Sequence, residues 1–156
     1  MNKGAGAGFT LLELVVVLVV IAVLAGLSGP SLRSLHDSVQ YREAVRLFTS
    51  AVRNGRLGAR SRGEAIDLIV DPRNNRFLLT DDANTLDVAD YQSLAEELHI
   101  EVTYAAEVGP GGDLAAIRFY PSGGSSGGEI VIQRPSGGGT RLTIDWLLGD
   151  ISQEVF

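Results

Sequence analysis

Residues 9–27 read FTLLELVVVLVVIAVLAGL, a run of 19 residues whose only charged side chain is that of Glu13. As an α-helix this run would be ~28 Å long, which is close to the ~30 Å hydrocarbon core of a bilayer. A helix that packs on the surface of a protein core has a polar face, and this run has none. The segment therefore predicts a helix that enters a membrane.

Three kinds of membrane segment share this pattern. A cleaved secretory signal peptide ends in small residues, and Val23-Leu24-Ala25 would pass as such a site. An uncleaved signal anchor is the second interpretation. The third starts from Glu13, because a carboxylate inside an apolar span costs about 2.5–3.5 kcal/mol on insertion scales, and such residues usually have a partner and a role.

The start of the chain resembles the class III leader of type IV pilins and type II secretion pseudopilins. The resemblance rests on Lys3, on Gly8-Phe9-Thr10-Leu11-Leu12-Glu13 and on the long apolar run that follows. In that family a membrane prepilin peptidase cuts between the glycine and the phenylalanine and then methylates the new N-terminus. The resemblance implies that residues 1–8 are a leader that is removed after Gly8, and that Phe9 becomes N-methylated.

The same resemblance implies roles for two further residues. It assigns Glu13 to subunit assembly, paired with the N-terminal amine of a neighbouring subunit. A buried carboxylate that meets an ammonium group recovers much of its desolvation free energy, so the assignment is physically reasonable. It also assigns Pro30 to a bend, because a proline inside a helix removes a hydrogen bond and kinks it.

The helix is expected to continue beyond the membrane segment. Residues 9–29 form the predicted transmembrane and assembly helix, and residues 30–62 form its amphipathic continuation. Apolar residues recur there at spacings near three and four, namely Leu32, Leu35, Val39, Leu47, Phe48 and Val52. Asn54-Gly55 is a typical helix stop, and Arg62-Gly63 is the alternative.

Charge is distributed unevenly along the chain, whose net charge is −6. Residues 33–62 contain seven arginines and two acidic residues, whereas residues 64–156 contain 16 acidic residues and five arginines. Arg42, Arg46, Arg53 and Arg60 fall on a common helix face. That face is either solvated or in contact with the acidic head of a neighbouring subunit.

After Gly63 the apolar pattern changes to period two, which is typical of strands. Strands are predicted at residues 66–70, 77–79, 100–104, 116–120, 129–133 and 141–148. The side chains expected to point inward are Ile117, Phe119, Ile130, Ile132, Leu142, Ile144 and Trp146. A short helix is predicted from Val88 to Leu98, with Asp87 or Asp90 as its cap. The predicted fold class is α+β, a long N-terminal helix packed on an antiparallel sheet that forms a head at residues 63–156.

The second half also resembles one branch of the family. The stretch Ile117-Arg118-Phe119-Tyr120-Pro121-Ser122-Gly123, followed by Ser126-Gly127-Gly128-Glu129-Ile130 and Arg141-Leu142-Thr143-Ile144, is similar to H-type minor pseudopilins of type II secretion systems and to minor type IV pilins of the FimT/FimU kind. That group often closes with Thr-Gly-Arg-Val. This chain has Leu148-Gly149-Asp150-Ile151, so an acidic residue replaces a basic one.

No catalytic residue is predicted. The chain has no cysteine, which excludes disulfides, thiolate metal sites and cysteine nucleophiles. Residues 123–128 match the nucleophile-elbow pattern G-x-S-x-G twice, but that elbow needs a following helix and a later histidine. A strand is expected there instead, and His36 and His99 both come earlier.

No metal site or cofactor is predicted either. Several oxygen ligands cluster at residues 81–90, namely Asp81, Asp82, Asn84, Asp87 and Asp90. Their spacing is not that of an EF-hand, and helix capping and turn formation explain them equally well. Calcium binding at this loop therefore remains an open alternative.

The resemblance implies a structural role rather than an enzyme. The main expectation is a minor pseudopilin of the type II secretion pseudopilus, which helps to export folded proteins across the outer membrane. Its expected partners are other pseudopilins, the prepilin peptidase, the inner membrane and an inner-membrane assembly platform, with the N-terminus cytoplasmic and the head periplasmic. The alternative is a minor type IV pilin in pilus assembly, adhesion or DNA uptake. Nucleic-acid binding is not expected, because the head is acidic and affinity for DNA comes largely from phosphate neutralisation.

Overall fold

The computed structural model describes residues 10–83, 86–105, 108 and 110–156, except for the side chains of residues 25–36. The chain divides into two compact units, Met1–His36 and Asp37–Phe156. Helix α1, Leu11–Arg62, begins in the first unit and ends in the second. The second unit, called the head below, contains the sheets.

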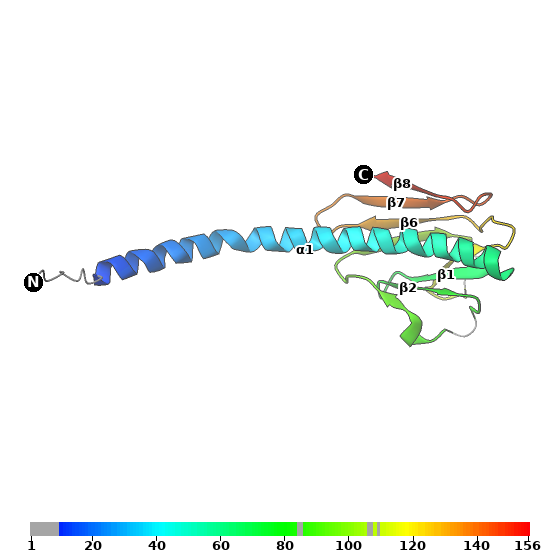
Figure 1. The fold of residues 1–156 in the computed structure, drawn as a ribbon, viewed down its shortest axis with the longest axis horizontal. Coiled ribbons are helices and arrows are strands. Elements are labelled where there is room, and N and C mark those ends of the chain that lie inside the picture. The colour runs from blue at the N-terminus through cyan, green and yellow to red at the C-terminus, as the bar shows by residue number, and fades with distance from the viewer. Residues whose placement is uncertain (1–9, 84–85, 106–107, 109) are drawn as a thin grey trace, which may run out of the picture. The chain divides into compact units, whose positions relative to one another are not determined.

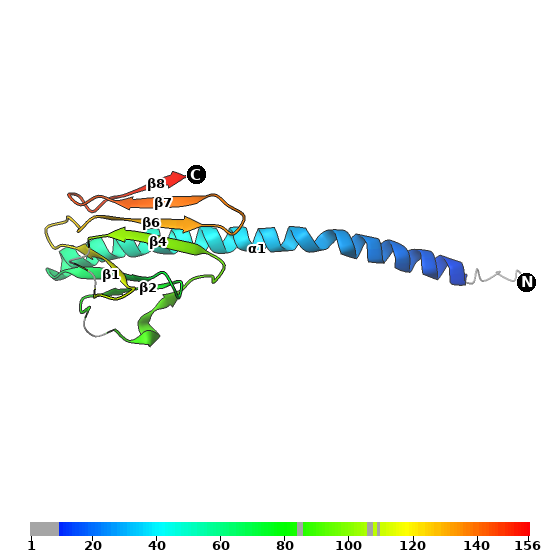
Figure 2. The same ribbon diagram turned by 180° about the vertical axis from the view of Figure 1, so that it is seen from behind.

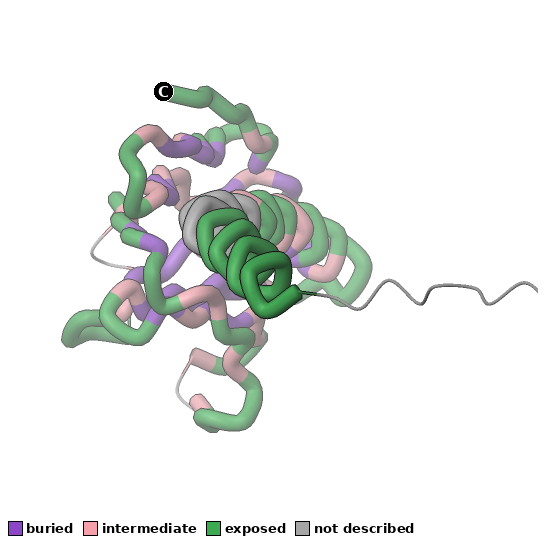
Figure 3. Tube along the Cα trace, turned by 90° about the vertical axis from the view of Figure 1, so that its left-hand side faces the viewer, coloured by how far each residue is buried: buried purple, intermediate pink, exposed green. Residues whose placement is uncertain are grey.

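In the first unit, the side chains of residues 11–24 are all exposed. Figure 3 shows this part of α1 in the colour of exposed residues. Among the described residues, no helix combines the length and the apolar content needed to cross a membrane. The membrane segment predicted at residues 9–29 includes Phe9 and the side chains of residues 25–29, which lie outside the description.

Helix α1 does not stop at Asn54-Gly55, so the earlier of the two predicted stops is wrong. It ends at Arg62, where Gly63 has a positive φ of 74° and donates its N–H to the Ala59 carbonyl at 3.0 Å. This is the left-handed glycine that commonly ends helices. Gly55 serves a different purpose, because a Cβ there would lie 2.6 Å from Cδ2 of Phe119. The glycine lets the helix approach the sheet closely.

In the residues that the structure describes, the head contains two antiparallel sheets of four strands each rather than the single sheet that was expected. The first has the order β3-β2-β1-β5, and its strands are β1 (Ile66–Asp71), β2 (Arg76–Thr80), β3 (Gln92–Ser93) and β5 (Ala115–Phe119). The second has the order β4-β6-β7-β8, and its strands are β4 (His99–Tyr104), β6 (Gly128–Gln133), β7 (Gly139–Ile144) and β8 (Ile151–Val155). The part of α1 that belongs to the head lies across both sheets (Figures 1 and 2).

One hydrophobic core joins the helix to both sheets. Phe48 and Val52 of α1 are fully buried, and the ring of Phe48 lies 4.7 Å from that of Phe77, centroid to centroid. The inward residues predicted on the strands are buried, namely Ile117, Phe119, Ile130, Ile132, Leu142 and Ile144. Val39, which was assigned to the same apolar stripe, is instead 65% exposed. Among the described side chains, the first fully buried one is that of Ala44, whereas the predicted stripe residues Leu32 and Leu35 lie outside the described side chains.

Three local predictions in the head were wrong. The predicted helix is a single 3-10 turn, Val88–Asp90, capped by the carboxylate of Asp87, which accepts a 3.0 Å hydrogen bond from the Ala89 N–H. Strand β7 ends at Ile144 because the Asp145 carboxylate accepts bonds from the N–H groups of Leu147 and Leu148 and closes a turn. Trp146, expected to point inward, lies in that turn and is 67% exposed. Strand β8 was not predicted.

Candidate assembly helix and head surfaces

Glu13 lies in the first turn of α1, and its side chain is exposed. Its N–H donates to the Thr10 carbonyl at 3.1 Å and approaches the Thr10 hydroxyl oxygen at 3.3 Å. Thr10 and Glu13 thus have the spacing of a capping box, in which the first residue caps the helix and the acid stands three residues later. A carboxylate at this end also interacts favourably with the helix dipole.

The surface of the helix around Glu13 is apolar on every side. From Leu11 to Leu24, Glu13 is the only residue with a charged or polar side chain. A helix that is apolar all round is stable only when lipid or other protein surrounds it. Glu13 is therefore the one position in this stretch that can make a directional polar contact with a neighbour.

The other predicted residues of the N-terminal site lie outside the described residues. Gly8 and Phe9, the predicted cleavage and methylation positions, belong to this group, as does the side chain of Pro30. Helix α1 is assigned without a break through residue 30. Cleavage, methylation and a bend at Pro30 remain predictions.

In the head, the four arginines predicted to share a helix face are all exposed, as are Val39 and Leu57 of the same helix. Arg46 forms an ion pair with Glu43 one turn earlier, at 2.5 Å. This hydrogen bond lowers the pKa of Glu43 below its usual value. None of the other three, Arg42, Arg53 and Arg60, forms an ion pair with a described residue.

A fifth arginine of α1 explains the acidic departure in the closing motif. Arg56 forms an ion pair and a hydrogen bond with Asp150. Gly149, the residue before Asp150, has a positive φ of 63°, and a Cβ there would lie 2.9 Å from the Gly123 carbonyl oxygen. Asp150 therefore ties the loop after β7 to the helix. Sequence analysis missed Arg56, although the acid at position 150 was a signal that a nearby cation balances it.

The serines of the glycine-rich loop are engaged in hydrogen bonds within the fold. The Ser125 hydroxyl donates to the Asp145 carbonyl and accepts from the Gly127 N–H, both at 2.9 Å, and its side chain is buried. The Ser126 hydroxyl accepts a 3.0 Å bond from the Arg118 N–H. Strand β6 follows this loop, so the helix that a nucleophile elbow requires is not present at this position.

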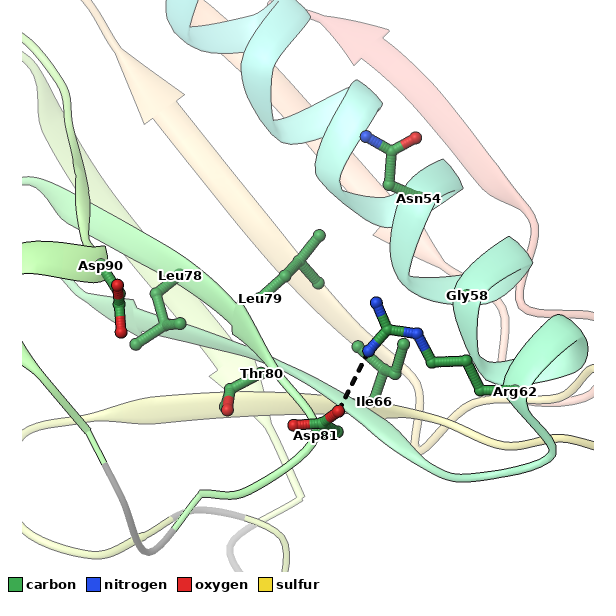
Figure 4. A pocket seen from close by; sticks show the side chains of 9 residues that line it. All are labelled: Asn54, Gly58, Arg62, Ile66, Leu78, Leu79, Thr80, Asp81 and Asp90. Carbon is green, nitrogen blue, oxygen red and sulfur yellow. Dashed lines mark hydrogen bonds and ion pairs between the residues drawn. The ribbon is translucent and has the colours of Figure 1, made fainter.

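The acidic loop at residues 81–90 borders an open groove of about 460 Å³ between α1 and β2. Figure 4 shows Arg62 reaching across this groove to Asp81, with a distance of 3.0 Å between the paired atoms. Asp87 caps the 3-10 turn, as described above. Within the part of the chain that the structure describes, no three His, Cys, Asp or Glu side chains are grouped so as to hold a metal ion. Asn84 lies outside that part.

Two buried carboxylates on β1 stabilise the first sheet, and sequence analysis did not identify them. Asp67 accepts two 2.7 Å bonds from Arg118, its cross-strand neighbour on β5. This pairing raises the pKa of Arg118. Asp71 accepts bonds from Asn74 and Arg76 at the β1–β2 turn. Burial acts to raise the pKa of Asp71, but these hydrogen bonds outweigh it and leave that pKa lowered.

Comparison with known proteins bears on both ends of the molecule. Residues 5–29 match the family model of the prokaryotic N-terminal methylation motif. The search of curated proteins gave no match. Among solved structures, the chain is similar to the minor pseudopilin EpsH from the type 2 secretion system of Vibrio cholerae, with a TM-score of 0.57 and 13% sequence identity. The match covers 74% of this chain and 97% of EpsH. The chain thus matches a prokaryotic N-terminal methylation motif and has an α+β fold similar to that of EpsH, as the resemblance predicted.

Proposed function

We propose that the chain is a minor pseudopilin, a structural subunit of the type II secretion pseudopilus that helps to export folded proteins across the outer membrane. The observation that carries the proposal is a combination within one chain. A methylation motif at residues 5–29 precedes a head whose fold is that of a minor pseudopilin. The role is mechanical rather than catalytic, and its chemistry is the burial of apolar surface and the pairing of charges.

The apolar helix would serve twice, first as an anchor in lipid and then as a packing element between subunits. Its described residues 11–24 expose leucine, valine and isoleucine on every side. Transfer from lipid to a bundle of like helices leaves such a surface in an apolar environment, so the move needs a directional contact to favour it. Glu13 supplies that contact when it pairs with the N-terminal ammonium group of a neighbouring subunit.

The proposal implies a topology and a set of partners. The N-terminus would be cytoplasmic, the helix would lie in the inner membrane, and the head would be periplasmic. The prepilin peptidase would process the chain between Gly8 and Phe9. Other pseudopilins and an inner-membrane assembly platform would then incorporate it into the fibre.

Mass spectrometry of the mature protein tests the proposal directly. The full chain, expressed together with a prepilin peptidase, should lose residues 1–8 and gain one methyl group on Phe9. Without the peptidase it should keep its leader. A mature chain that starts at Gly26 would instead mean a cleaved signal peptide and would overturn the proposal.

A matched pair of variants locates the cleaved bond. Gly8→Val places a branched side chain next to that bond and should block processing. Gly6→Val makes the same change two residues earlier, and it should be processed like the parent. Equal processing of both variants would contradict cleavage at Gly8.

A further inference from the structure

A line of arginines follows one face of α1 within the head. Arg42, Arg46, Arg53 and Arg60 are separated by four, seven and seven residues, which places them near one another around the helix axis. The line extends over ~27 Å at 1.5 Å per residue. These four residues are called the arginine stripe below.

The stripe is poorly compensated compared with the arginines of the strands. Four arginines of the sheets and their turns each have a carboxylate partner, at distances of 2.6 to 3.1 Å: Arg73 with Asp113, Arg76 with Asp71, Arg118 with Asp67 and Arg141 with Glu129. In the stripe, only Arg46 has such a partner among the described residues. On the helix, Arg56 and Arg62 are also paired, with Asp150 and Asp81. Among the described residues, the arginines without a carboxylate partner are therefore three members of the stripe and Arg134, whose guanidinium lies over the Tyr41 ring.

The stripe also borders a hollow surface. Two adjoining depressions, of about 380 and 560 Å³, lie between α1 and the β8 side of the head, and both are lined by Arg53 and Leu57. Their far wall is formed by residues 149–151 and by Gln153. Leu57 is 64% exposed, and the loop that leads into Gly149 exposes Trp146, Leu147 and Leu148. These two depressions together are called the arginine groove below. Their lining is both basic and apolar.

The complementary surface lies elsewhere on the same head. Residues 77–117 contain nine acidic residues and no lysine or arginine. Within them, Asp90, Glu96 and Glu97 are exposed, and none forms an ion pair with a described residue. The Asn75 side-chain amide fixes this stretch by donating to the carbonyls of Ala95 and Leu98, at 2.9 and 2.7 Å. Residues 90–101 are called the acidic segment below.

Among the described residues, no ion pair joins the two surfaces within one molecule. The arginine groove lies beside β8, an edge strand of the second sheet, whereas the acidic segment includes β3, an edge strand of the first. Figures 1 and 2 show β8 and the stretch around the 3-10 turn at opposite edges of the head. The two surfaces lie on either side of α1, since Ser50 and Asn54 line both the arginine groove and the hollow that contains Asp90. A contact between two different surfaces of identical molecules is head-to-tail, and it repeats into an open chain unless its rotation closes a ring.

We infer that the arginine groove binds the acidic segment of a second copy of this chain. Leu57 and the exposed residues of the 146–148 loop favour a protein over a nucleic acid, and so does the net charge of −6. The contact orients the heads and sets their association rate more than it sets their affinity, and it weakens as salt increases. It extends the proposed function, because it would supply a contact between the heads of neighbouring subunits.

Because the chain has no cysteine, introduced thiols can form disulfides only with one another, which allows a cross-linking test of the contact. Leu57→Cys places a thiol in the arginine groove of one copy, and Ser93→Cys places one on β3, inside the acidic segment, of a differently tagged copy. Mixed as full chains in detergent micelles under mild oxidation, the two should form the heterodimer several-fold faster than either forms its homodimer. An increase of salt from about 50 to about 500 mM should reduce the rate markedly.

Charge reversal then tests the pairing itself. Arg53→Glu in the Leu57→Cys copy should lower heterodimer formation about fivefold or more, and Glu97→Arg in the other copy should restore much of it. Arg73→Glu is the matched control, because it changes the net charge equally at an exposed turn outside the arginine groove. Thermal melting should give the same midpoint for all of these surface variants.

Three outcomes would overturn the inference. One is a heterodimer rate no higher than that of the homodimers, and another is equal loss with Arg53→Glu and Arg73→Glu. The third is saturable DNA binding that Arg53→Glu abolishes while the disulfide yield stays unchanged. Because the assay uses neither leader processing nor Glu13, any of these results leaves the proposed pseudopilin role to be judged by the mature mass.

Discussion

At the scale of single residues, Asp71 contributes to how the stability of the head responds to acid. Its side chain is only 5% exposed and accepts bonds from Asn74 and Arg76, so the ionised form is favoured in the folded state and the pKa lies below its usual value of 3.8. The unfolded chain therefore binds a proton at higher pH than the folded chain does. The stabilisation is fully present above about pH 3.8 and is lost as pH falls through the lowered pKa of the folded state.

We therefore expect Asp71→Asn to flatten the acid limb of the stability profile. At neutral pH it should also reduce the free energy of unfolding by about 1–3 kcal/mol, because the Arg76 guanidinium loses its charged acceptor. Urea unfolding of the full chain in detergent, at pH values from about 6 to about 3, measures both effects. Asp113→Asn is the control, since Asp113 pairs with Arg73 at an exposed site and should change the profile little. An unchanged acid slope in Asp71→Asn would contradict this account.

At the scale of elements, local patterns predicted most of the head but could not predict how its strands are shared between sheets. The β1–β2 hairpin was found because Ile66, Leu68 and Val70 alternate before a turn-forming stretch. Strand β8 was missed because it is an edge strand that exposes nearly every side chain, so it lacks an apolar period. The division into two sheets depends on pairings between distant strands, which no local period records.

The same limit applies to the functional surfaces. The methylation motif could be predicted because its signals lie within one short stretch, which the family model also matches, whereas the assembly role of Glu13 stays a prediction. The Arg56–Asp150 pair could not, because its partners are 94 residues apart and only the folded chain brings them together. The arginine stripe was predicted from helical spacing, whereas the groove beside it depends on where β8 lies.

A prediction at the scale of elements concerns how closely helix α1 packs on the sheet at Gly55. Gly55→Ala should gain about 1 kcal/mol of helix propensity but place its Cβ 2.6 Å from the fully buried ring of Phe119. Overpacking of that kind costs about 1–3 kcal/mol, so a lower melting temperature is expected. Gly58→Ala is the matched control, because its Cβ meets only Cδ1 of Ile66, the flexible end of a side chain. A Gly55→Ala variant at least as stable as Gly58→Ala would contradict close packing at Gly55.

At the scale of the whole molecule, the proposed polar contacts between subunits involve two places. One is Glu13, the only charged residue between Leu11 and Leu24, and the other is the arginine stripe, which lies in the head. Contacts at the helix would act in an apolar environment, where an unpaired carboxylate is strongly disfavoured. Contacts at the head would act in water, where charge pairs are weaker and depend on salt. Incorporation into a fibre should therefore depend much more on Glu13 than on any one arginine.

Glu13→Leu tests whether incorporation into a fibre depends on the Glu13 carboxylate. Loss of the carboxylate removes about 2.5–3.5 kcal/mol of insertion cost, so the variant should enter the membrane at least as well as the parent. It should nevertheless fail to enter fibres, because the ammonium group of the neighbouring subunit has no partner. The measurement is the fraction of the chain recovered in sheared fibres relative to the membrane, with leader removal checked by mass.

Thr10→Ala separates assembly from helix capping, the other role that the structure gives to this turn. It removes the capping hydroxyl, which is worth about 1 kcal/mol, but keeps the carboxylate. If Glu13 acts on the neighbouring subunit, Thr10→Ala should enter fibres nearly as well as the parent while Glu13→Leu does not. If the two variants lose incorporation equally, Glu13 serves its own helix, and the ion pair between subunits must be abandoned.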